Sequence, residues 1–274
     1  MGLLSEMHDA SLERVARARE RVPEEVLRRA ALAALAPPPL RLAPRGFDVI
    51  AELKLRSPSL GDLSEATIDP VQRLEAYAAG GAAACSILTE PTRFDGDLGH
   101  LRLAAEALGP LGVPVMRKDF LVDPYQVLEA RAHGASGVLL IVRMVPRARL
   151  VELLDSAAGL GMFALLEAFD AADLEVAAGI ARERAGRDEQ VLMGLNCRDL
   201  ETLAIDFGRF EALRDRLPSA WPAVAESGVQ TPEDAAQVAA LGYRLALVGT
   251  RLMRHAEPER ALRELLTAGR GELR

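Results

Sequence analysis

Short apolar runs of strand length recur eight times in this chain, and a helical stretch follows each of them. The runs are almost continuously apolar rather than alternating, as parallel strands buried on both faces require. A parallel strand needs a long crossover to reach its neighbour, so this repeat restricts the chain to α/β folds. The expected strands cover residues 47–53, 82–88, 114–116, 137–142, 163–166, 191–195, 223–225 and 245–248.

The predicted helix ends share a repeated chemistry. Helices are expected to begin where a capping residue precedes a proline, at Asp69-Pro70, Asp123-Pro124 and Thr231-Pro232. Several helices are expected to end in glycine just before the next strand, as at Gly80, Gly81, Gly134, Gly161 and Gly242. The turns therefore support the strand and helix pattern independently of hydrophobicity.

Eight strand-helix units across residues 47–274 match the number and size of a single (β/α)8 TIM barrel. A doubly wound open sheet is the alternative, but no Gly-rich dinucleotide turn follows the first run, and the eightfold regularity favours closure. Residues 1–46 contain helical patterns and no strand, with one helix expected from Pro23 towards Ala36. We therefore predict an N-terminal helical extension over residues 1–46 and a catalytic barrel over residues 47–274.

The composition excludes several classes of function. Half of the 274 residues are apolar and 27% are charged, and the net charge of −7 comes without a basic block, which argues against nucleic acid as a partner. No signal pattern and no membrane-length apolar run is present, so a cytoplasmic protein without membrane contact is expected. Two cysteines and four scattered histidines form no disulfide framework and no metal-ligand spacing, so we expect no metal and no cofactor.

Polar residues end nearly every expected strand. In a TIM barrel the active site is built from these carboxyl ends and the loops after them, so three carboxylates and two lysines would converge on one mouth and require pairing or a ligand. In strand order, the residues are Glu52 and Lys54; Thr89; Lys118 and Asp119; Arg143; Glu167; Asn196 and Arg198; Glu226, Ser227 and Gly228; and Gly249 and Thr250.

The use of lysine singles out two of these positions. The chain has 33 basic residues, and all of them are arginine except Lys54 and Lys118. Arginine holds its proton at any ordinary pH, whereas the pKa of a lysine can be tuned by burial and neighbours. The two lysines are therefore expected where arginine would fail, as an acid, a base or a nucleophile.

Small residues after the last two strands predict a phosphate site. Ser227-Gly228 and Gly249-Thr250 place backbone N–H groups where an anion can approach, at the position of the phosphate site that many barrels share. Ser57 and Lys54 are expected either to complete this shell or to hold a second anionic group.

The acid-base candidates are Lys118 and Glu167, on the third and fifth strands. A second lysine and nearby carboxylates are expected to tune the pKa of Lys118 towards the working pH. Apolar cover from Phe120 and Phe169 is expected to raise the pKa of the Glu167 carboxyl. A Schiff-base role for Lys118, as in an aldolase, is an open alternative.

From about Leu12 to the C-terminus the chain resembles the indole-3-glycerol-phosphate synthase family. The resemblance implies a step of tryptophan biosynthesis, in which 1-(2-carboxyphenylamino)-1-deoxyribulose 5-phosphate is cyclised, decarboxylated and dehydrated to indole-3-glycerol phosphate. The motifs that carry it are Ile50-Ala51-Glu52-Leu53-Lys54 with Ser57-Pro58-Ser59 and Gly61, Arg117-Lys118-Asp119-Phe120, Gly194-Leu195-Asn196-Cys197-Arg198-Asp199-Leu200, Ala225-Glu226-Ser227-Gly228 and Val248-Gly249.

The resemblance also implies roles for these residues. Lys118 would be the general acid that activates the substrate carbonyl, Glu167 the base of the later steps, and Lys54 and Glu52 their assistants. The remaining implied contacts are Asn196, Arg198 and Ser57 with the anthranilate or its carboxylate, Glu226 with the lysines or a sugar hydroxyl, Ser227, Gly228, Gly249 and Thr250 with the phosphate, and Phe94, Phe120 and Leu139 with the aromatic ring. The chain departs from the family pattern at Leu60, Phe169, Cys197 and Thr250.

Two rival functions remain open. A phosphoribosylanthranilate isomerase would use a Cys/Asp acid-base pair, which the expected strand ends do not supply. A non-catalytic barrel that binds a sugar phosphate or a protein would be expected to have lost a lysine or Glu167. Both a monomer and a homodimer are compatible with the sequence.

Overall fold

A computed structural model gives the fold and describes residues 2–44, 46–54, 56–57, 61–62, 69–200 and 202–271, with side chains described outside 56–57 and 61–62. Over these residues eight parallel strands close into a barrel in the order β1-β10-β9-β8-β7-β6-β5-β4. The strands are β1 Asp48–Leu53, β4 Ala84–Leu88, β5 Val115–Lys118, β6 Gly137–Ile141, β7 Phe163–Ala168, β8 Val191–Asn196, β9 Ala223–Glu226 and β10 Leu245–Val248. The (β/α)8 barrel predicted from the sequence is confirmed.

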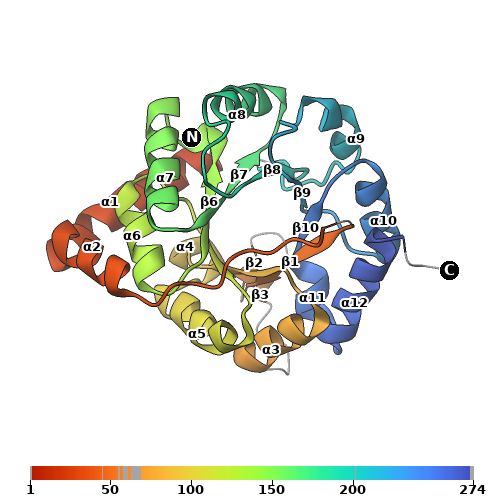
Figure 1. Cartoon of the computed structure of the whole chain (residues 1–274), viewed down its shortest axis with the longest axis horizontal. Helices are drawn as coiled ribbons and strands as arrows, with labels where there is room; N and C mark the ends of the chain where they lie inside the picture. Colours follow the sequence, from red (N-terminus) through yellow and green to blue (C-terminus); the bar gives the residue numbers. More distant parts are fainter. Residues whose placement is uncertain are drawn as a thin grey trace.

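Helices surround the strands and cover their outer faces (Figure 1). Apolar side chains of both layers form one large core, as expected for strands that are buried along their whole length. The helices are α1 Leu3–Arg21, α2 Glu24–Ala33, α3 Pro70–Gly80, α4 Pro91–Phe94, α5 Leu98–Leu108, α6 Pro124–Ala132, α7 Arg147–Gly159, α8 Ala171–Glu183, α9 Arg209–Leu213, α10 Pro232–Ala240, α11 Thr250–Arg254 and α12 Pro258–Gly269, with 3-10 turns at Gly109–Leu111, Val142–Met144 and Arg214–Arg216.

The predicted helix starts carry the expected caps. The Asp69 carboxylate accepts hydrogen bonds from the backbone N–H groups of Val71 and Gln72, 2.8 and 3.3 Å away. Asp123 and Thr231 each form a capping box, in which the third helical residue bonds back to the cap. The second helix of the N-terminal segment, however, ends at Ala33 and not at Ala36.

Four strands run further than the apolar pattern predicted. β5, β7, β8 and β9 continue through Lys118, Glu167, Asn196 and Glu226, which the sequence had placed just after the strands. A polar side chain can continue a barrel strand where it faces the open mouth, so the last apolar residue does not mark the strand end. Two short antiparallel strands, β2 Arg56–Ser57 and β3 Gly61–Asp62, follow β1 and were not predicted.

The N-terminal helices pack against the barrel beside β5 and α6. The Ser11 hydroxyl donates to the Phe120 carbonyl, and Arg14 Nη2 donates to Asp119 Oδ1 at 2.8 Å. The Tyr125 hydroxyl donates to a carbonyl of α1, that of Ala18, 3.1 Å away. Helix α1 therefore contacts the residues that directly follow Lys118, while α2 lies against α6 (Figure 1). The division into residues 1–46 and 47–274 stays a prediction.

In the described ranges, none of the helices combines enough residues with enough hydropathy to cross a bilayer.

Phe210 gives a test of the core. Its ring is fully buried and makes edge contacts with Phe207 and Tyr243, with ring centroids 5.1 and 5.2 Å apart. We expect Phe210→Ala to lower the free energy of unfolding by about 3–5 kcal/mol, because it removes a large buried ring and leaves a cavity. Leu35→Ala, at a side chain that is 92% exposed, should change it by less than about 0.5 kcal/mol in the same urea titration. Equal effects would contradict this packing.

Candidate active site

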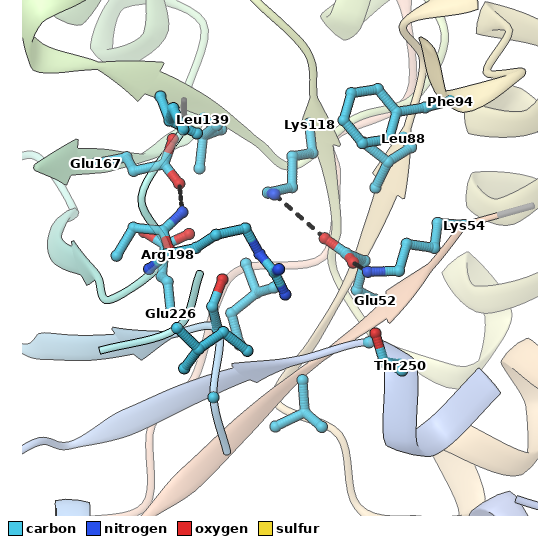
Figure 2. Close-up of a pocket in the computed structure, with 18 of the residues that line it drawn as sticks. Glu52, Lys54, Leu88, Phe94, Lys118, Leu139, Glu167, Arg198, Glu226 and Thr250 are labelled. Carbon is cyan, nitrogen blue, oxygen red and sulfur yellow. Dashed lines mark hydrogen bonds and ion pairs between the residues drawn. The ribbon is translucent and has the colours of Figure 1, made fainter. Parts of the chain in front are cut away.

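One pocket lies at the carboxyl ends of the barrel strands (Figure 2). It is lined by all but one of the residues to which the sequence assigned a catalytic or substrate-binding role. Those in the pocket are Glu52, Lys54, Phe94, Lys118, Phe120, Leu139, Glu167, Asn196, Arg198, Glu226, Ser227, Gly228, Gly249 and Thr250. The exception is Ser57, whose side chain lies outside the described residues, as do Pro58, Ser59 and Leu60.

Glu52 is shared by both lysines of the chain. Lys54 Nζ lies 2.8 Å from Glu52 Oε1, and Lys118 Nζ lies 3.3 Å from Glu52 Oε2. Figure 2 shows the two amines pointing at this one carboxylate, that of Lys118 from β5 and that of Lys54 from the residue after β1. Burial alone would raise the pKa of Glu52, but the two ammonium groups outweigh it and lower that pKa to about 2. Glu52 is therefore an anion at every physiological pH.

Lys118 is held in its protonated form. Burial would lower its pKa, but the carboxylates of Glu52, Glu167 and Glu226 together raise the pKa of Lys118 above its usual range. The sequence-based expectation that its pKa is tuned down towards the working pH is therefore wrong. The attraction of the surrounding carboxyl groups, that of Glu52 first, exceeds the cost of desolvating this ammonium.

A second chain of hydrogen bonds orients Glu167. Asn196 Nδ2 donates to Glu167 Oε1 at 2.7 Å, and Asn196 Oδ1 accepts from the backbone N–H of Arg198 at 2.9 Å. The single asparagine of the chain thus fixes the carboxylate and the loop that carries Arg198 at the same time. The Arg198 guanidinium reaches into the middle of the pocket (Figure 2), and its Nη1 donates to the Leu203 carbonyl.

Glu226 is the pocket's unpartnered carboxyl. Its side chain is 1% exposed, and neither oxygen has a hydrogen-bond partner among the described residues. Burial and the neighbouring Glu167 raise the pKa of Glu226 well above its usual value, against the opposing effect of Lys118. Glu226 is therefore the carboxyl of the site most strongly biased towards the neutral, protonated form.

Two glycines make room for these carboxyls. A Cβ atom at Gly194 would overlap Glu226 Oε1, and one at Gly249 would overlap Glu52 Oε1. Gly249 was predicted only as a phosphate contact, and Gly194 was not predicted at all. Glycine inside a strand pattern indicates a close approach, so the signal at Gly194 was present in the sequence.

The loop after β9 has an unusual backbone conformation. Ser227 and Gly228 both have positive φ angles, of 65° and 77°. Positive φ is unusual for a residue with a side chain, and such strain is concentrated at functional sites. Ser227 and Gly228 line the same pocket as Gly249 and Thr250, which directly follow the neighbouring strand β10.

An apolar wall completes the pocket. Phe94 and Phe120 lie with ring centroids 6.4 Å apart, and Leu139 of β6 lines the same pocket. Three further apolar side chains of the wall were not predicted, because they come from the start of α1 and from the loop after β8. These side chains are Leu3, Leu203 and Ile205.

Some polar residues at strand ends serve the scaffold. Arg143 pairs with Asp170 and Asp173 and does not line this pocket. Asp119 accepts hydrogen bonds from Thr89 and from the guanidinium of Arg117 at 2.8 and 3.0 Å. No cluster of three metal-ligating side chains occurs in the described parts of the chain.

Comparisons with known proteins agree with the family resemblance seen in the sequence. A family model described as indole-3-glycerol phosphate synthase matches residues 4–265. A protein named indole-3-glycerol phosphate synthase from Nocardioides sp. is 45% identical over 241 residues, covering 86% of this chain and 88% of its own length. A protein of the same name from Micrococcus luteus is 42% identical over 279 residues, covering 98% of both chains.

Two solved structures share the fold at low identity. Thiamine phosphate pyrophosphorylase from Pyrococcus furiosus matches with a TM-score of 0.58 and 16% identity, over 83% of this chain and 97% of the other. The 3-hexulose-6-phosphate synthase from Salmonella typhimurium matches with a TM-score of 0.63 and 11% identity, over 81% and 98%. At these identities the likeness concerns the barrel alone.

The shared Glu52 carboxylate predicts a specific acid dependence of stability. Its folded pKa of about 2 lies below the ordinary 4.5, so its stabilising contribution is complete above the ordinary pKa and is lost as pH falls towards 2. The advantage of the wild type over Glu52→Gln in free energy of unfolding should therefore shrink by about 2 kcal/mol between about pH 7 and about pH 3. Urea unfolding across this range measures it, with the exposed Glu25→Gln as the control substitution. A constant difference would contradict the pairing.

Proposed function

The chain belongs to the indole-3-glycerol-phosphate synthase family, and from that premise we propose how the pocket at the barrel mouth carries out the family's reaction. The protein is a carbon-carbon lyase of tryptophan biosynthesis that forms indole-3-glycerol phosphate. The observation that carries the mechanism is a single pocket in which the ion pairs of Lys118 and Lys54 with Glu52 face the hydrogen-bonded Glu167 and Asn196 (Figure 2).

Ring closure begins at the substrate carbonyl. Attack of the anthranilate ring carbon on this carbonyl places negative charge on its oxygen, and a proton donor there lowers the barrier. Lys118 Nζ carries a proton, faces the pocket and is held 3.3 Å from Glu52 Oε2. In this mechanism Lys118 donates that proton as the new carbon-carbon bond forms.

The charge state of Lys118 favours an acid over a Schiff-base nucleophile. A Schiff base requires a neutral amine, which enzymes obtain by lowering the lysine pKa through desolvation or a neighbouring cation. The surrounding carboxylates instead raise the pKa of Lys118. The aldolase-like alternative therefore requires the opposite electrostatics.

Glu167 is suited to the later steps. After ring closure, loss of carbon dioxide restores the aromatic ring, and loss of water then requires a base for a proton on the carbon beside the ring nitrogen and an acid for the departing hydroxyl. Glu167 accepts a hydrogen bond from Asn196 and is oriented into the pocket, so we assign it the base role. Lys54, held 2.8 Å from Glu52, is the second cation and assists as a proton donor or as an anion contact.

Glu226 fits the role of a neutral hydrogen-bond donor. A protonated carboxyl can donate to a sugar hydroxyl or to an intermediate and adds no negative charge beside an anionic substrate. Glu226 lines the pocket, and neither of its oxygens has a hydrogen-bond partner in the described structure. A neutral Glu226 carboxyl is therefore consistent with the role expected from the sequence, which is to orient a sugar hydroxyl or the lysines.

The walls of the pocket correspond to the parts of the substrate. The turn at Ser227 and Gly228, with Gly249 and Thr250, would hold the phosphate, and Arg198 would hold the anthranilate carboxylate. Asn196 acts mainly through its bonds to Glu167 and the Arg198 backbone. The aromatic ring would lie against the apolar wall of Phe94, Phe120 and Leu139, whereas the contact predicted for Ser57 stays a prediction.

The rival functions fit less well. An isomerase with a Cys/Asp pair needs a reactive thiol, but Cys197 is buried and its pKa is raised by burial to about 11. A barrel without catalysis would not need a protonated lysine, an oriented carboxylate and a neutral carboxyl in one pocket. The cytoplasmic location and the oligomeric state, monomer or homodimer, stay predictions.

Turnover tests the proposal directly. The wild type should convert 1-(2-carboxyphenylamino)-1-deoxyribulose 5-phosphate to a product with indole fluorescence, and Lys118→Ala should lower kcat by about 10²- to 10⁴-fold because the proton donor is removed. Lys118→Arg keeps the positive charge but donates a proton poorly, so KM should stay near that of the wild type while kcat falls.

Arg102→Ala on the outer face of α5, where the side chain is 67% exposed, is the control and should leave both constants unchanged. Absence of turnover by the intact wild type would exclude the synthase activity. Normal turnover by Lys118→Ala would leave the activity in place and overturn the role of Lys118.

A further inference from the structure

Arg251 lines the pocket directly after the predicted phosphate contacts. It is the second residue of α11 and follows Gly249 and Thr250, which line the same pocket. No role was predicted for Arg251 from the sequence, because it lies beyond the residues that directly follow β10. An arginine at the phosphate end of a pocket is chemically distinctive, because its planar guanidinium can donate two parallel hydrogen bonds to a phosphate.

The guanidinium is only partly engaged within the protein. Arg251 Nη2 lies 3.3 Å from Glu264 Oε2 on α12, while Glu264 Oε1 accepts from Arg260 Nε at 3.0 Å. Arg251 Nε is buried, and no described group accepts its hydrogen. One carboxylate thus serves two arginines, and it engages the Arg251 guanidinium through a single nitrogen.

The charges in the pocket also favour a further cation for the phosphate. Lys54 and Lys118 share the single carboxylate of Glu52, and Lys118 is further surrounded by Glu167 and Glu226. A substrate phosphate carries close to two negative charges at neutral pH. Backbone N–H groups of the turns supply only partial charges, so a full positive charge beside them would strengthen the site.

We propose that Arg251 binds the phosphate group of the substrate, as a side-chain ligand added to the backbone donors of Ser227, Gly228, Gly249 and Thr250. The inference rests on the proposed placement of the phosphate at these strand ends. Glu264 is then a positioning residue, which holds the guanidinium through Nη2 and leaves the other terminal nitrogen, Nη1, for the anion. Arg251 contributes to substrate affinity and not to the bond-making steps.

The test distinguishes two roles of Arg251: binding the phosphate, or only linking α11 to α12 through the ion pair with Glu264. Arg251→Gln removes the guanidinium and with it the ion pair to Glu264. Glu264→Gln breaks the same ion pair but leaves the guanidinium of Arg251 in place. We expect Arg251→Gln to raise both KM and the inhibition constant of inorganic phosphate by roughly 10- to 100-fold, with kcat within about threefold of the wild type, as expected for loss of a charged hydrogen bond. Glu264→Gln should leave the inhibition constant within about threefold, or lower it.

Two further variants complete the design. Arg251→Lys keeps the charge without the fork and should lie between the wild type and Arg251→Gln. Arg254→Gln removes an exposed arginine of the same helix that does not line the pocket, and it should leave phosphate inhibition unchanged. Thermal unfolding at increasing concentrations of inorganic phosphate measures phosphate binding in the absence of turnover. The rise in midpoint temperature that phosphate causes in the wild type should be smaller in Arg251→Gln.

The outcomes distinguish this inference from the assigned reaction. Wild-type turnover, with an unchanged KM and phosphate inhibition constant in Arg251→Gln, would overturn the role of Arg251 alone. An equal weakening of phosphate binding in Glu264→Gln would show that the ion pair, and not a phosphate contact, is what matters. Failure of the wild type to turn over substrate would instead contradict the proposed function.

Discussion

The sharing of Glu52 by Lys54 and Lys118 is the interaction on which the site depends. Each ammonium group alone would be costly to bury, and so would the carboxylate, but together they satisfy one another at 2.8 and 3.3 Å. The pairing joins β1 to β5 across the barrel mouth. It also decides chemistry, because a lysine held among carboxylates keeps its proton and can act as an acid.

The carboxyls of the site take different charge states because their neighbours differ. Glu52 faces two ammonium groups and has its pKa lowered, whereas Glu226 faces burial and Glu167 and has its pKa raised. Pairs of titratable groups whose environments separate their pKa values are typical of acid-base sites. Steric room is part of this arrangement, since Gly194 and Gly249 leave space that any side chain would fill.

Sequence reasoning found the barrel and most of the pocket because both follow from local patterns. Continuous apolar runs gave the strands, and residues such as Lys118 and Glu167 could be placed in the pocket because parallel barrel strands all end at one mouth. The direction of the Lys118 pKa shift was predicted wrongly, because the number of carboxylates around an amine depends on side-chain orientation in the closed barrel. Leu3 was missed because only the docking of α1 brings it to the pocket.

The neutral tendency of Glu226 connects this electrostatic arrangement to the substrate. The substrate brings a phosphate and a carboxylate, so further full negative charge beside them would oppose binding. Protonation of Glu226 reduces that opposition while preserving a donor, and Glu52 is already neutralised by its two lysines. Lys118 can therefore remain charged in a buried setting without the pocket as a whole repelling an anion. A lysine-carboxylate barrel mouth can in this way bind a polyanion and protonate its carbonyl at the same position.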